Sequence, residues 1–172
     1  MKGIVKGLSA LALATAVFAA PVHAQGSMVG VSGVGIFSLE EGGGSDFGAG
    51  ASFEWAGGNG FGARLDGNYL FDPETFVINA NVMYTFMTAE SSMVHPYLLA
   101  GGTLLGYNSF EENQFGISAG AGANFQLQNS PVTPFVDARF IRTFEKEGDL
   151  VTIPATSNIL VNAGVKFAIG GN

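Results

Sequence analysis

The stretch FGISAGAGANFQLQ, residues 115–128, decides the fold class, because its residues alternate strictly in character. Every second position from Phe115 to Leu127 is apolar, and the positions between them carry only Gly, Ser, Asn and Gln. A two-residue period is typical of a β-strand whose two faces meet different surroundings. The polar face has no Lys or Glu, which usually cover a solvated sheet. Small polar residues instead suit the crowded interior of a narrow barrel, with the apolar face outside.

Comparable stretches follow one another along the chain, separated by clusters of Gly, Pro, Asn, Asp and Glu. The further strands that we expect span residues 29–39, 47–55, 61–71, 75–88, 97–108, 136–144 and 159–169. Both faces of 29–39 and of 97–108 are apolar or Gly, so alternation does not decide how these two strands face. The pattern predicts an all-β fold, an eight-stranded antiparallel up-and-down transmembrane β-barrel.

Aromatic residues gather at the ends of the apolar faces. Phe115 and Phe125 are ten residues apart in one strand, which corresponds to about 25 Å along a barrel axis at the usual strand tilt. Phe76 stands against Tyr84 and Phe86 in the same way in the stretch 75–88. Aromatic rings prefer the boundary between membrane and water, so these positions predict two aromatic girdles. The alternative is that they are core aromatics of a soluble barrel.

The composition excludes several classes of protein. The chain has 172 residues, of which 47% are hydrophobic and 12% charged, and it contains 26 Gly and 15 Phe. Such a chain is too apolar to be disordered and has the length of one domain. Seven basic residues against 14 acidic ones exclude a strongly basic nucleic-acid-binding protein. Without Cys the chain has no disulfide, thiolate metal site or Cys nucleophile.

The N-terminal 24 residues have the three parts of a secretory signal peptide. Lys2 and Lys6 supply the positive start, an apolar run covers residues 8–20, and Val22, His23 and Ala24 resemble a cleavage site. An uncleaved anchor is the alternative, but the run is shorter than the roughly 20 residues that a spanning helix needs. We therefore expect a signal peptide at 1–24 and an outer-membrane barrel domain at 25–172.

Acidic residues segregate by turn. With the first strand starting in the periplasm, the turns at 40–46, 72–74, 109–113 and 145–157 are extracellular. These turns hold ten of the 14 acidic residues and one basic residue, Lys146, whereas the periplasmic turns hold only Glu90. The ten are Glu40, Glu41, Asp46, Asp72, Glu74, Glu111, Glu112, Glu145, Glu147 and Asp149. An acidic rim could attract divalent cations or cationic solutes, or could simply be a solvated face. No calcium-loop spacing is present.

Charged residues also occur on the face that alternation turns inward. They are Glu54, Arg64, Asp66, Asp137, Arg139 and Lys166, three acids and three bases. Buried charges are tolerated when they are paired, so we expect an internal salt-bridge network that plugs the lumen. The alternative is a small gated pore in which breaking these pairs opens a path for water. Arg142 falls on the outward face, where it would reach lipopolysaccharide phosphates or water.

Four motifs in order resemble a known family. HPYLLAGG (95–102), the Gly/Ala-alternating stretch at 115–125, PFVDARF (134–140) and NAGVKFAI (162–169) look like strands of the small eight-stranded outer-membrane β-barrels. This family includes opacity-type proteins and the barrel domain of outer-membrane protein A. The resemblance covers the whole mature chain. In the last motif, Asn162, Gly164, Phe167 and Ile169 resemble the signal read by the barrel-assembly machinery. The resemblance implies a location in the cell outer membrane, contact with its lipid including lipopolysaccharide, and periplasmic chaperones during export.

Enzymatic activity finds little support in the residues. The mature chain has one His, His95, which precedes a Pro at a periplasmic turn. Outer-membrane lipid A deacylases and palmitoyl transferases use His with Ser near the outer leaflet, and no His is expected on that side here. We expect a monomer without catalytic activity, cofactor, metal or nucleic-acid partner, with a structural or surface-interaction role. The alternatives are a narrow cation-leaning pore and, less favoured, a soluble periplasmic lipocalin-like carrier.

Overall fold

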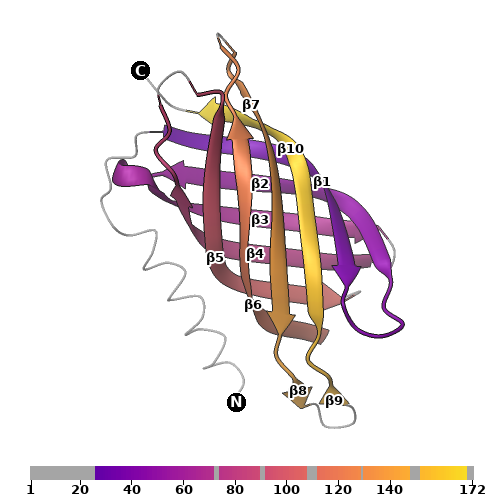
Figure 1. Ribbon diagram of the computed structural model, residues 1–172. Coiled ribbons are helices and arrows are strands. Elements are labelled where there is room, and N and C mark those ends of the chain that lie inside the picture. The colour runs from indigo at the N-terminus through magenta and orange to yellow at the C-terminus, as the bar shows by residue number, and fades with distance from the viewer. Residues whose placement is uncertain are drawn as a thin grey trace.

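Eight antiparallel strands close into a barrel in the computed structural model, which describes residues 26–71, 74–89, 92–107, 112–128, 130–147 and 152–169 (Figure 1). The strands are β1 (Gly26–Ser38), β2 (Ser45–Ala56), β3 (Phe61–Phe71), β4 (Glu74–Thr85), β5 (Val94–Tyr107), β6 (Glu112–Phe125), β7 (Val132–Thr143) and β10 (Ser157–Ile169). Around the barrel they follow the order β1-β10-β7-β6-β5-β4-β3-β2. The expected barrel of eight strands is confirmed. The expected signal peptide lies outside the described residues.

Two short strands lie in the connection between β7 and β10. β8 (Lys146–Glu147) pairs with β9 (Thr152–Ile153) and forms a hairpin that projects from one end of the barrel (Figure 1). The sequence predicted an extracellular turn at 145–157 and did not anticipate this hairpin within it. We call this end of the barrel the loop end, and the opposite end, where β2 turns into β3, the turn end.

Several strands start before the stretches that alternate, whereas β4 and β6 end three residues before the expected ends at 88 and 128. β6 begins at Glu112 and β7 at Val132, whereas alternation placed their starts at 115 and 136. Asp46, Glu74 and Glu112, which were expected in turns, therefore lie in strands. Pairing with a neighbouring strand continues through these positions, as in Glu112 with Tyr107, and the backbone ladder does not depend on side-chain character.

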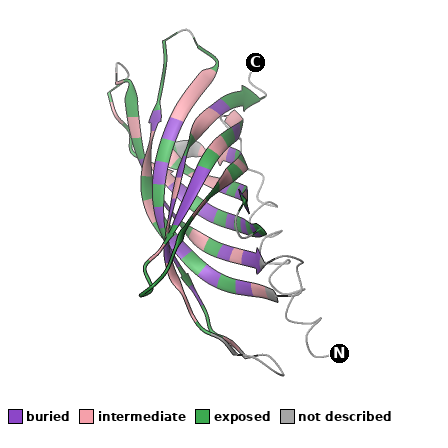
Figure 2. Cartoon of the chain, turned by 90° about the vertical axis from the view of Figure 1, so that its right-hand side faces the viewer, coloured by how far each residue is buried: buried purple, intermediate pink, exposed green. Residues whose placement is uncertain are grey.

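Burial alternates along most of the strands, as the two-residue period requires (Figure 2), whereas in β1 the consecutive residues Val34, Gly35 and Ile36 are all buried. In β4, every second residue from Thr75 to Met83 is buried and the residues between them are exposed. The structure also settles the two strands that alternation left open. Val34 and Ile36 of β1 face the interior, and so do Tyr97 and Leu99 of β5.

The exterior of the barrel is apolar. Val31 and Ile117 are 56% and 55% exposed, among many large hydrophobic side chains that point away from the interior. A barrel in water would place polar side chains there, so this surface suits the hydrocarbon of a membrane. No helix among the described residues is long and apolar enough to cross a membrane.

Two groups of aromatic rings lie at opposite ends of the exterior. At the turn end, the rings of Phe61 and Tyr84 have their centroids 4.9 Å apart, and Phe86 lies 5.3 Å from Tyr84. At the loop end, the centroids of Tyr69 and Phe76 are also 4.9 Å apart. The two bands correspond to the girdles that the sequence predicted.

The tight turn between β2 and β3 depends on glycine. A short 3₁₀ segment, η1 (Gly58–Gly60), carries left-handed backbone at Asn59 (φ 61°) and at Gly60 (φ 82°). A Cβ atom on Gly60 would lie 2.5 Å from the carbonyl oxygen of Thr85. Both the backbone conformation and the close approach to β4 therefore require Gly at this position.

Candidate functional site: the barrel interior

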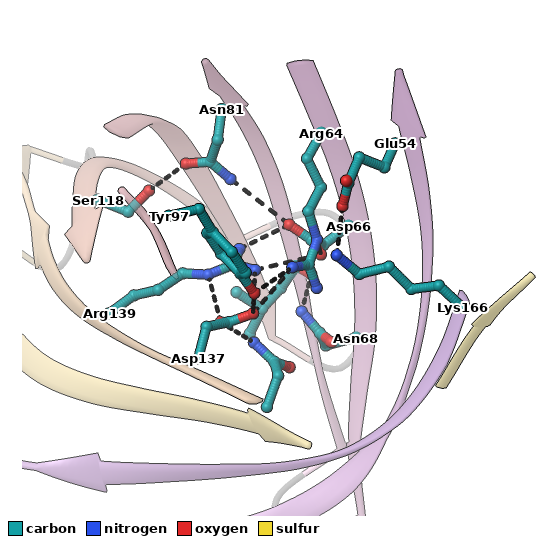
Figure 3. A network of polar contacts seen from close by, with 12 residues as sticks. Glu54, Arg64, Asp66, Asn68, Asn81, Tyr97, Ser118, Asp137, Arg139 and Lys166 are labelled. Carbon is teal, nitrogen blue, oxygen red and sulfur yellow. Dashed lines mark hydrogen bonds and ion pairs between the residues drawn. The ribbon is translucent and has the colours of Figure 1, made fainter. Parts of the chain in front are cut away.

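Six charged side chains from four strands meet inside the barrel (Figure 3). Each of the six residues, Glu54, Arg64, Asp66, Asp137, Arg139 and Lys166, is at most 2% exposed. They come from β2, β3, β7 and β10. In the strand order around the barrel, β3 and β7 are separated by three strands on either side. Contacts between these two strands therefore cross the full width of the interior.

Four of these residues form a closed ring of ion pairs. Arg64 reaches both carboxylates, with Nε 2.6 Å from Asp66 Oδ1 and Nη1 2.8 Å from Asp137 Oδ2. Arg139 does the same, with Nη1 2.6 Å from Asp66 Oδ2 and Nε 2.9 Å from Asp137 Oδ1. Each strand contributes one Arg and one Asp two residues apart, which puts both on the inward face. The two acids neutralise the two bases, so the ring carries no net charge.

A second ion pair lies beside the ring, between Lys166 of β10 and Glu54 of β2. Lys166 Nζ also donates to Asn124 Oδ1 at 2.8 Å and lies 4.7 Å from the ring centroid of Phe135. Gly30 of β1 leaves the space that the lysine crosses, since a Cβ there would lie 3.2 Å from Lys166 Cγ. The lysine thus gains a carboxylate, an amide oxygen and an aromatic face in place of water.

The network includes residues that the sequence did not assign to it. The Tyr97 hydroxyl donates to Asp137 Oδ2 at 3.0 Å and accepts from Arg64 Nη1 at 3.2 Å. Asn162 Nδ2 donates to Asp137 Oδ1 at 3.0 Å, although its place in the motif at 162–169 indicated an assembly signal. Ser118 donates to Asn81 Oδ1 at 2.9 Å (Figure 3). Tyr97 was missed because the facing of its strand was undetermined.

An apolar layer lies between the ring and the loop end. Its members are contributed by β1, β3, β4, β5, β7 and β10, and all are buried: Val34, Ile36, Leu70, Val77, Leu105, Ile141 and Leu160. On β3, Leu70 follows Asp66 toward the loop end, and on β7, Ile141 follows Arg139. The interior therefore contains two kinds of packing, charged and apolar, at successive depths.

Cavities lie at the two ends of the barrel. A cavity of about 250 Å³ at the turn end is lined by residues that include Glu54, Asn124 and His95. A cavity of about 190 Å³ at the loop end has Ile36, Leu70 and Leu105 of the apolar layer among its lining residues. The ring and the apolar layer lie between these two spaces.

His95 lies near the start of β5 and faces the turn-end cavity. Its Nδ1 atom is 2.8 Å from the Thr88 hydroxyl. Its Nε2 atom is buried and has no hydrogen-bond partner in the described part of the chain. A nucleophile and base of the serine-hydrolase kind need a third group that orients the base. No such carboxylate contacts His95 among the described residues, and these also contain no group of three His, Cys, Asp or Glu placed to hold a metal.

The acidic residues of the loop end are only partly described. Glu40, Glu41, Glu74 and Glu145 are exposed, whereas Asp46 is half-buried and lines the loop-end cavity. Three of the ten, Asp72, Glu111 and Asp149, lie outside the described residues, and for Glu112 and Glu147 only the backbone is described.

Arg142 faces outward at the loop end, as its place in β7 predicted. Its Nη1 atom is 3.7 Å from Glu40 Oε1 and it donates to the Ser157 hydroxyl. The backbone N–H of Ser157 donates to the same Glu40 oxygen at 2.9 Å. These contacts join the first loop to the start of β10.

The other residues of the motif at 162–169 lie on the strand that closes the barrel. Gly164 meets β1 closely, since a Cβ there would lie 2.1 Å from the carbonyl oxygen of Val31. Phe167 and Ile169 are exposed on the exterior. Their role as an assembly signal stays a prediction.

Comparisons with known proteins bear on the fold. No family model and no curated protein matches the chain. Among solved structures, the chain is similar to Neisserial surface protein A, with a TM-score of 0.66 and 19% identity over 84% of this chain and 97% of that one. The fold is that of a small outer-membrane β-barrel.

Two structures from Pseudomonas aeruginosa give the same result. The N-terminal barrel domain of OprF has a TM-score of 0.61 and 16% identity over 86% of this chain and all of that one. The outer membrane protein OprG has a TM-score of 0.60 and 10% identity over 87% of this chain and 99% of that one. These neighbours confirm the expected fold class and support the expected location in the outer membrane.

Proposed function

We propose that this protein is an integral outer-membrane barrel with a sealed interior and a structural or surface-interaction role. The observation that carries this proposal is the ring of Arg64, Asp66, Arg139 and Asp137, which joins the opposite strands β3 and β7. An eight-stranded barrel encloses barely more than its own side chains. A ring across its full width therefore leaves little room for a solute.

Opening a path for water or solutes through this interior would be energetically unfavourable. A path through the ring requires its four ion pairs to break, and each buried charge left without a partner is strongly unfavourable. The same path must then pass the apolar layer, where Ile141 and Leu160 are fully buried. Water has no polar partners in that layer, so breaking the ring alone would not hydrate the interior.

The exterior supports contact with lipid rather than with a second chain. Closure of β1 on β10 leaves no free edge in the barrel, so pairing with another copy is not needed. The apolar surface between the aromatic bands fits the hydrocarbon core, and the outward position of Arg142 at the loop end supports contact with lipopolysaccharide phosphates. We propose a monomer without catalytic activity or cofactor, delivered by periplasmic chaperones and the barrel-assembly machinery.

Conductance across a planar lipid bilayer tests the sealed interior. We expect no stepwise current from the folded wild-type protein or from Arg139→Gln, because the apolar layer stays in place. We expect current steps when Arg139→Gln is combined with Ile141→Ser and Leu160→Ser, which weakens the ring and introduces polar groups into the apolar layer. Each protein is first shown to be folded by its altered gel mobility before boiling. Regular current steps from folded wild-type protein would instead favour a narrow pore, and selectivity for cations would agree with the acidic loop end.

A further inference from the structure

The cavity at the loop end has the form of a cup with one charged wall. Ile36, Leu70 and Leu105 form its apolar floor. Its polar lining includes the side chains of Ser38, Asp46, Thr75, Thr156 and Asn158. Its volume of about 190 Å³ is below the range typical of drug-sized ligands, so only a small molecule would fit.

The polar wall is held in place by hydrogen bonds. The backbone N–H of Thr156 donates to Thr143 Oγ1 at 2.8 Å, and Asn158 Nδ2 donates to Thr156 Oγ1 at 3.2 Å. On the neighbouring strand β1, where Ser38 pairs with Asn158, the N–H of Ser38 donates to the carbonyl of Gly44 at 3.0 Å and closes the first loop. The cup is therefore formed before anything binds, which reduces the entropy lost on binding.

Two polar groups in the cup have no protein partner. Thr75 is only 3% exposed, and its hydroxyl makes no hydrogen bond within the described part of the chain. Asp46 makes no ion pair or side-chain hydrogen bond to the residues that the structure describes. A buried hydroxyl without a partner is unfavourable, so a ligand that supplies one is favoured.

The surroundings of the cup favour a positive charge. Glu40, Glu41 and Glu145 are exposed at the same end, and Arg142 is turned outward beside Glu40. Hard divalent cations in proteins are usually held by several carboxylate and carbonyl oxygens, whereas the cup offers a single carboxylate beside an apolar floor. An organic ammonium ion meets both parts of the cup, since its charge pairs with Asp46 and its carbon chain covers the floor.

We propose that the cup binds small primary alkylammonium ions from the outer side of the membrane. The ammonium group pairs with Asp46 and donates to the Thr75 hydroxyl, and the alkyl chain lies on Ile36, Leu70 and Leu105. This inference adds a class of ligand to the proposed surface role. It rests on that role in one respect, namely the side of the membrane that the cup faces. Since the apolar layer closes the floor, the ion is held and does not pass through the barrel.

Calorimetric titration of the refolded protein in neutral detergent tests the proposal, with butylammonium chloride as the probe and empty micelles as the blank. We expect saturable binding of one equivalent and at least tenfold weaker binding of butanol, which has the chain without the charge. Asp46→Asn should weaken the binding of butylammonium about tenfold, and Thr75→Val should weaken it by a smaller factor. The matched control is Glu41→Gln, which removes an exposed acid outside the cup and should change the affinity less than twofold.

Three results would overturn the proposal. Equal binding of butanol would show that only the apolar floor acts. Displacement of butylammonium by equimolar magnesium would indicate a site for hard cations. An equal loss in Glu41→Gln and Asp46→Asn would indicate diffuse attraction by the acidic end. Gel mobility before boiling confirms that each variant is folded. Binding is measured in detergent and conductance in a bilayer, so the two proposals are tested separately. Absence of butylammonium binding would contradict the ligand site, whereas current steps from the wild-type protein would contradict the sealed interior.

Discussion

Arg64 and Asp137 stand 73 residues apart in the sequence and meet in the middle of the barrel, with Arg64 Nη1 2.8 Å from Asp137 Oδ2. The contact joins β3 to β7, which lie on opposite sides of the barrel. Backbone hydrogen bonds connect each strand only to its neighbours. The ion pairs across the interior therefore add a connection that the sheet itself does not provide.

Removing one arginine of the ring is expected to destabilise the barrel strongly. Arg139→Ala leaves Asp66 and Asp137 sharing one base in a buried site, and an uncompensated buried charge costs about 3–5 kcal/mol. The free energy of unfolding in urea, followed in lipid vesicles by the fluorescence of the single tryptophan, Trp55, measures the loss. Arg142→Ala is the control, because its exposed pair with Glu40 is worth at most about 1 kcal/mol. Equal losses in the two variants would contradict a structural role for the ring.

The Lys166 and Glu54 pair is expected to behave as a coupled unit. Lys166→Met leaves the Glu54 carboxylate buried without its base and should cost about 3–5 kcal/mol. Adding Glu54→Gln removes that charge and should restore most of the lost stability. A double-mutant cycle measured by urea unfolding gives the coupling energy. Strictly additive losses would mean that the two side chains do not stabilise each other.

Gly164 is expected to tolerate no side chain at the strand that closes the barrel. In Gly164→Ala the new methyl group would meet the backbone of β1, with the carbonyl oxygen of Val31 2.1 Å from the Cβ position. Overpacking of this kind costs about 1–3 kcal/mol. Gly67→Ala is the matched control, because nothing lies within 4 Å of a Cβ on Gly67. Urea unfolding of both variants should show a loss only for Gly164→Ala, and an unchanged Gly164→Ala would refute the close contact.

The cost of a charge on the exterior is expected to depend on its depth. Ala119 is exposed and lies near the middle of β6, so Ala119→Arg should cost about 2–4 kcal/mol in a bilayer. Leu127 follows the end of β6 at the turn end, and Leu127→Arg should cost no more than about 1 kcal/mol. The comparison is made by unfolding from lipid vesicles. A soluble barrel would show no such difference, since both arginines would point into water.

The two-residue period predicted the strands and most of their inward residues, because alternation follows from where a side chain points and needs no knowledge of partners. It failed for β1 and β5, where Gly and apolar residues occupy both faces. Tyr97 and three of the seven residues of the apolar layer lie on these two strands, so neither Tyr97 nor the complete layer was anticipated. Val34, Ile36 and Leu105 could not be distinguished from lipid-facing residues of the same type.

The sequence also did not predict which charged side chains contact one another. Arg64 and Asp66 are inward by parity, but their contact with Arg139 and Asp137 depends on the stagger of eight strands around the barrel. The same holds for Asn162, whose position in a familiar motif gave no sign of its bond to Asp137. Periodicity fixes the face of a residue, whereas its depth along the axis comes from the closed sheet.

Cell fractionation combined with gel mobility tests whether the protein is a barrel that spans the outer membrane. The full chain is produced in a Gram-negative host, and its outer-membrane and periplasmic fractions are compared with and without boiling. We expect a species in the outer-membrane fraction whose mobility changes only on boiling, because a closed barrel resists detergent. Recovery of the folded protein in the soluble periplasm would contradict the membrane-spanning barrel and would favour a soluble carrier.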